Sequence, residues 1–65
     1  MKRRELERLL REHGAIVKRE GARHTIWINP KTGQKSEVPR HAEIKKNTAR
    51  GICKDLGIDP QNITS

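Results

Sequence analysis

The side chains best suited to chemistry in this chain are its histidines, His13, His24 and His41, together with the basic residues near them. Imidazole has an unperturbed pKa of about 6.5, so it can give and take protons near neutral pH. Arginine and lysine can hold a phosphate, and arginine can bind two phosphate oxygens at once. RNA cleavage without a metal uses these residue types: a base for the 2′-hydroxyl, an acid for the leaving 5′-oxygen and cations for the phosphate.

The net charge points to a polyanionic partner. The 65 residues include 15 Lys and Arg and 8 Asp and Glu, which gives a formal net charge of +7. Such a field attracts polyanions, with nucleic acid as the first candidate and an anionic membrane surface as the second. The charge can instead serve only to keep a small protein in solution. We favour nucleic acid because +7 is high for so short a chain.

Composition and length argue against several other classes. Residues 1–65 are enough for one small domain. Trp27 is the only aromatic residue, so a cofactor pocket lined with aromatics is not expected. The lone Cys53 excludes an internal disulfide, and the histidines lack metal-ligand spacing, so we expect neither metal nor cofactor. No apolar run reaches the length of a membrane span or signal core, which indicates a cytoplasmic protein without a membrane partner.

Two helices are expected, one in each half of the chain. Residues 2–13 have a 3.6-residue apolar period and should end at Gly14 in the left-handed conformation. The apolar face of this helix consists of Leu6, Leu9, Leu10 and His13. Asn47 or Thr48 should cap a second helix that runs to about Leu56, with Gly57 after it. Its apolar face consists of Ala49, Ile52, Cys53 and Leu56. A close approach of this helix to the sheet would explain the glycine inside it, Gly51.

Three extended segments lie between the helices, at residues 15–19, 23–29 and 34–38. Turns containing glycine or proline separate them, so we expect an antiparallel meander. In the middle segment, Ile26 and Ile28 should lie on one face and Thr25 and Trp27 on the other. The predicted fold class is α+β, a small α-β-β-β-α domain whose three-stranded sheet has both helices on one face.

Four stretches of the chain together resemble the HicA toxin family. They are AIVKREG at 15–21, HTIWI at 24–28, VPRH at 38–41 and NTARGICKDLGI at 47–58. Their order and spacing carry the resemblance, which covers nearly the whole chain. The family usually reads Gly-Ser-His where this chain reads Ala22-Arg23-His24, and it commonly has glycine at the position of Asn47.

The resemblance implies both a fold and an activity. The fold would be like that of double-stranded-RNA-binding domains, and the activity that of a ribosome-independent endoribonuclease acting on mRNA. It also implies a HicB-type antitoxin that covers the active site and often binds operator DNA. We expect the toxin to be a monomer alone and part of a hetero-oligomer with the antitoxin.

His24 is the catalytic residue that the resemblance implies. On the residues alone it is more simply a strand-edge histidine on the face of Ile26 and Ile28; the family position makes it a general base or acid. Basic residues at the first turn and before the second helix are expected to contact RNA phosphates. These residues are Lys18, Arg19, Arg23, Arg40, Lys45 and Lys46. Lys2, Arg3 and Arg4 are interpreted as a solvated face of the first helix.

The remaining candidates have structural alternatives that we favour. His41 can cap its loop, contact the antitoxin or carry the second proton, and the structural role is preferred. His13 should meet the last carbonyls of the first helix. Trp27 can stack on a base or pack within the chain or at an interface, and packing is more common.

Two other functions remain open from the sequence. One is a non-catalytic RNA-binding module with the same fold. The other is a DNA-binding regulator, which is weaker because a short second helix containing Gly51 makes a poor recognition helix.

Overall fold

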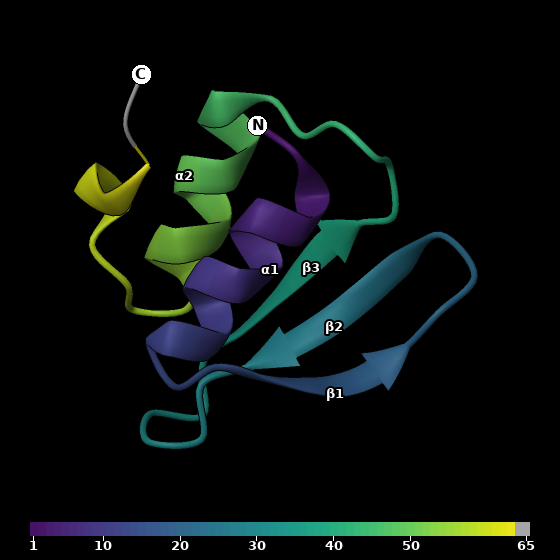
Figure 1. Cartoon of the computed structure of the whole chain (residues 1–65). Helices are drawn as coiled ribbons and strands as arrows, with labels where there is room; N and C mark the ends of the chain where they lie inside the picture. The colour runs from purple at the N-terminus through teal and green to yellow at the C-terminus, as the bar shows by residue number, and fades with distance from the viewer. Residues whose placement is uncertain (64–65) are drawn as a thin grey trace.

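The computed structural model describes residues 1–63 and has the element order that the sequence predicts (Figure 1). Within these residues the elements are α1 (Arg3–Glu12), β1 (Ile16–Glu20), β2 (His24–Ile28), β3 (Lys35–Pro39), α2 (Lys46–Asp55) and a short 3₁₀ helix, η1 (Pro60–Asn62). The predicted α+β class is therefore confirmed, and the element bounds lie within a residue or two of their predicted positions. None of the helices within residues 1–63 has the length and hydrophobicity that a membrane span requires.

β2 divides its side chains between the two faces of the sheet. Thr25 and Trp27 are buried, whereas His24 is exposed and Ile26 and Ile28 are half-buried. The predicted alternation is confirmed. Both helices cover the face that carries Trp27 and leave the face of His24 open (Figure 1). The core therefore lies between the helices and one side of the sheet.

The strands pair antiparallel in the order β1-β2-β3, with one irregularity. In the β1–β2 ladder Val17 lies opposite Trp27, but Arg19 lies opposite Ile26. Lys18 is therefore the extra residue of a β-bulge, which changes the local direction of the strand. The β2–β3 ladder is regular over its whole length.

The core is aliphatic except for one tryptophan and one cysteine, as the composition requires. Its buried members are Leu6, Leu10, Ala15, Trp27, Val38, Ile44, Ala49, Ile52, Cys53, Leu56, Ile58 and Ile63. Burying each large aliphatic side chain contributes about 1.5–3 kcal/mol to folding. Both helices end as predicted, because Gly14 and Gly57 have φ values of 90° and 73°.

The start of α2 differs from the prediction. Lys45 occupies the N-cap position, and its own side chain makes no capping hydrogen bond, so the predicted cap by Asn47 or Thr48 was wrong. The reason is a tertiary contact. The backbones of Met1 and Ile44 exchange two hydrogen bonds of 2.8 Å, which fix the direction of the chain just before the helix.

Gly51 does not mark a close approach of α2 to the sheet. A Cβ built on this residue would meet no atom within 4 Å among the described residues, and the position is exposed. The explanation offered from the sequence is therefore wrong, and nothing in the structure requires glycine there.

Candidate functional site

His24 lies at the start of β2 with its side chain exposed on the open face of the sheet. Pro39 of β3 lies opposite it in the ladder. The carbonyl oxygen of His24 accepts a hydrogen bond of 2.8 Å from the backbone nitrogen of Gly21, which closes the β1–β2 turn. The backbone of the histidine is thus fixed, while its imidazole reaches solvent.

The turn before His24 is held by the loop that follows β3. Arg40 donates from Nη1 to the carbonyl oxygen of Gly21 at 3.0 Å and from its backbone nitrogen to the carbonyl oxygen of Arg23 at 3.2 Å. Glycine is required at position 21, because a Cβ there would lie 2.8 Å from the carbonyl oxygen of His24. Arg40, predicted to contact nucleic acid, therefore also has a structural contact, and its side chain remains exposed.

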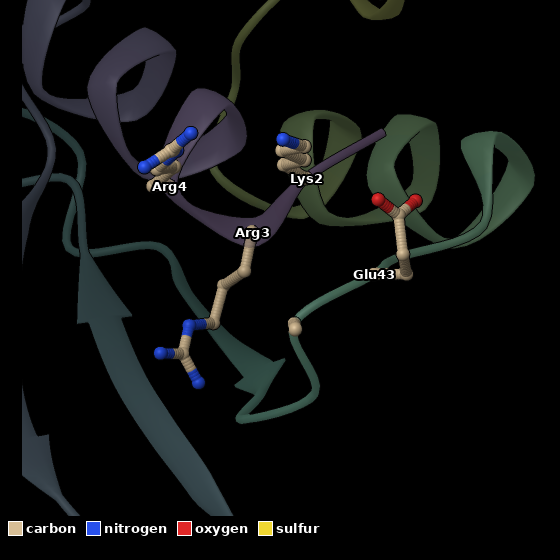
Figure 2. Close-up of a pocket in the computed structure, with 5 residues that line it drawn as sticks. Lys2, Arg3, Arg4 and Glu43 are labelled. Atoms are coloured by element: carbon tan, nitrogen blue, oxygen red, sulfur yellow. The ribbon is translucent and has the colours of Figure 1, made fainter.

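Arg3 connects this loop to the start of α1. Its Nη1 donates to the carbonyl oxygen of Arg40, and Lys2 pairs with Glu43 in an isolated antiparallel bridge. Arg3 and Arg4 line a hollow of about 340 Å³. Figure 2 shows their side chains extending in different directions. Arg3 thus makes a tertiary hydrogen bond in addition to the solvent contact that the sequence predicts for it. No local pattern signals a contact between residues 37 positions apart.

A hollow of about 390 Å³ on the open face brings basic residues of two strands together. It is lined by Lys18, Arg19, Ile26 and Lys35. Lys18 and Arg19 were predicted to act together, but Lys35 was not among the predicted contacts. Only the register of β3 against β2 places Lys35 there, and local sequence patterns do not determine that register.

Lys35 affects the protonation of Lys18. A side-chain hydrogen bond with Lys35, and then repulsion from its charge, lower the pKa of Lys18 below the ordinary value for lysine. Desolvation and the charge of Arg19 act in the same direction. A bound anion would relieve this repulsion.

The other predicted basic contacts fall in two places. Arg23 is exposed in the turn directly before His24. Lys45 and Lys46 are exposed at the start of α2, in the helical layer, where Lys46 lines a separate hollow of about 430 Å³ with residues of α1 and η1. The structure therefore gathers some of the predicted contacts on or beside the open face and leaves Lys45 and Lys46 apart from them.

The other two histidines have different surroundings. Nδ1 of His13 lies 3.0 Å from the carbonyl oxygen of Leu9, which confirms its predicted contact with the last carbonyls of α1. His41 is exposed in the loop after β3, and its role stays a prediction. Among residues 1–63, no group of three or more His, Cys, Asp and Glu side chains comes together as a metal site.

Trp27 and Cys53 both belong to the core. Trp27 is fully buried and so packs within the chain rather than stacking on a base. The guanidinium carbon of Arg11 lies 5.1 Å from its ring centroid, within the range of a cation–π interaction. Cys53 is also fully buried, as predicted, and burial raises the pKa of its thiol. The neutral, inaccessible thiol is unsuited to act as a nucleophile.

Comparison with known proteins identifies the family of this chain. A family model described as "HicA toxin of bacterial toxin-antitoxin" matches residues 3–58, which include every element from α1 to α2. No curated protein and no solved structure matches the chain. Because the family match covers most of the sequence, the chain belongs to the HicA family, the toxins of bacterial toxin–antitoxin systems.

Proposed function

We propose that this toxin is an endoribonuclease that cuts mRNA without a metal ion and uses His24 as its general base or general acid. The observation that carries the proposal is the placement of His24, which is exposed on the open face directly after a turn that fixes its backbone. Neither α1 nor α2 covers that face, so an RNA strand lying across it can bring a phosphodiester to the imidazole.

In the reaction, the phosphorus atom of the RNA backbone exchanges its bond to the 5′-oxygen of the next nucleotide for a bond to the neighbouring 2′-oxygen. The 2′-oxygen loses its proton to a base and attacks phosphorus, and the bond to the 5′-oxygen breaks as that oxygen gains a proton from an acid. The products are a 2′,3′-cyclic phosphate and a 5′-hydroxyl. His24 performs one of the two proton transfers.

Cations near His24 would hold the phosphate while its charge develops. Arg23 adjoins the histidine in sequence, and Arg40 contacts the same turn with one nitrogen of a guanidinium that has further donors to offer. The contacts assigned to RNA are Lys18, Arg19, Arg23 and Arg40 near the open face and Lys45 and Lys46 in the helical layer. The last two would bind RNA away from the cleaved bond.

The partner of the toxin would be an antitoxin of the HicB type that inhibits cleavage by covering the open face. A basic surface favours a partner with complementary negative charge. The toxin alone would be a monomer and would form a hetero-oligomer with the antitoxin.

One sequence presented as single-stranded RNA and as single-stranded DNA tests the reaction. We expect purified protein to cut the RNA and not the DNA. The RNA fragments should carry 2′,3′-cyclic phosphate ends, which mass spectrometry identifies. Equal cleavage of the DNA would exclude attack by the 2′-hydroxyl. Binding of the RNA without cleavage would favour the non-catalytic RNA-binding module, in keeping with Ala22 and Arg23 in place of the usual Gly-Ser.

A further inference from the structure

The hollow formed by Lys18, Arg19, Lys35 and Ile26 lies on the same face as His24 but is separate from it. Ile26 follows the histidine by two residues on β2, a distance of about 7 Å along the strand. Ile26 provides an apolar floor to the hollow, and the three basic residues, which come from β1 and β3, border it on both sides.

The basic residues of the hollow are gathered without carboxylates to balance them. Its lining contains no Asp or Glu, and the ion pair found among residues 1–63 joins the N-terminal ammonium to Glu43, 3.5 Å apart. Glu37 lies opposite Ile26 on β3 but is not part of the lining. A side-chain hydrogen bond with Lys35, and then repulsion from its charge, lower the pKa of Lys18, in keeping with two amines that line one hollow. An anion bound between the two amines would offset their repulsion.

We propose that this hollow binds an RNA phosphodiester next to the one that is cleaved, with the amines of Lys18 and Lys35 on the same phosphate and Ile26 beneath the attached ribose or base. The inference rests on the proposed function, because it takes the strand that His24 cleaves as the ligand. Cations around an apolar floor suit a strand in which phosphates alternate with apolar sugar and base surfaces. The carboxylates of an acidic peptide could pair with the cations, but such a peptide would make no apolar contact with Ile26.

Binding of a short single-stranded RNA with 2′-O-methyl groups tests this subsite, since that probe cannot undergo 2′-hydroxyl attack. The proteins to compare are wild type, Lys18→Gln, Lys35→Gln, the double variant and Lys54→Gln. The last removes the same charge from an exposed position on α2. Circular dichroism verifies that each variant is folded.

Each substitution in the hollow should weaken binding. The double variant should make the negative slope of log K against log salt concentration shallower by about 0.7, the value for one phosphate, and each single variant should change it by less. The loss of binding free energy in the double variant should be smaller than the sum of the losses in the two single variants, because both amines hold one phosphate. Lys54→Gln should change affinity and slope less than either single variant.

The proposed subsite would be contradicted if Lys18→Gln and Lys35→Gln had the same RNA affinities and salt slopes as Lys54→Gln. Weaker binding to the antitoxin with unchanged binding to RNA would also overturn it and would assign the hollow to a protein contact. Cleavage of unmodified RNA by the wild type is scored separately. If the hollow variants lose RNA affinity and the wild type does not cut, the subsite is supported while the proposed function fails.

Discussion

Arg40 donates a hydrogen bond from Nη1 to the carbonyl oxygen of Gly21 at 3.0 Å, and so ties the loop after β3 to the turn that precedes His24. The backbone nitrogen of the same residue donates to Arg23 at 3.2 Å, so both ends of the turn are held from one position. A guanidinium has a planar set of donors, whereas the ammonium of lysine is a compact point charge. The contact therefore depends on the shape of arginine as well as on its charge.

Replacing Arg40 by lysine should lower kcat about 10- to 100-fold, because the turn that places His24 loses its side-chain support. The retained charge should keep KM and the salt dependence of RNA binding close to those of the wild type. Steady-state cleavage kinetics measure both parameters, and Arg4→Lys on the exposed face of α1 is the matched control. A wild-type kcat for Arg40→Lys would limit Arg40 to an electrostatic role.

Gly21→Ala and Gly51→Ala should change stability in opposite directions. The first places a Cβ 2.8 Å from the carbonyl oxygen of His24 and should lower the free energy of unfolding by about 1–3 kcal/mol. The second places a Cβ in open space on a helix and should raise it by about 1 kcal/mol. Urea denaturation measures both. Equal destabilisation by the two alanines would contradict the geometry of the β1–β2 turn.

Lys35→Glu should raise the melting temperature while it weakens RNA binding. The substitution replaces the repulsion between Lys35 and Lys18, which lie on the two strands that flank β2, by attraction. It also removes a cation from the hollow and adds an anion. Thermal unfolding and RNA titration provide the two measurements, with Lys54→Glu as the charge-matched control. A melting temperature below that of the wild type would show that the two amines do not destabilise the fold.

The thiol of Cys53 should make stability depend on pH in the alkaline range. Burial raises its folded-state pKa, so its contribution is fully present below the unfolded-state pKa of about 8.5 and is lost as the pH rises through the folded value. Cys53→Ala should cost about 1 kcal/mol at neutral pH, and the cost should shrink above about pH 8.5. Urea denaturation of both proteins over a pH series measures the difference. A difference that stays constant with pH would contradict a buried, neutral thiol.

Local sequence patterns were sufficient to predict the helices and strands and most of their buried faces, although His13, predicted on the apolar face of α1, is exposed. The helical period of residues 2–13 and the glycine at position 14 predicted α1 and its end, because both act within a few residues of the chain. Alternation in β2 separated His24 from Trp27. It did not show which side the helices cover, since isoleucines alternate with the tryptophan and either face offered apolar side chains.

Contacts between distant segments could not be predicted in this way. Lys35 reaches the hollow through the β2–β3 register and meets Lys18 because of a bulge, and neither feature has a local signature. Arg40 contacts Gly21 across 19 positions in sequence. The start of α2 was misplaced for the same reason, because backbone bonds from Met1 outweigh the capping preference of nearby polar residues.

The most direct test of the account is cleavage of a defined single-stranded RNA by purified protein in the presence of EDTA, with wild type compared to His24→Ala. We predict that the wild type cuts and that the variant does not, although the variant keeps its circular dichroism spectrum and its affinity for RNA. Undiminished cutting by His24→Ala would contradict the assignment of the catalytic histidine. Loss of wild-type cutting in EDTA would contradict the metal-independent mechanism.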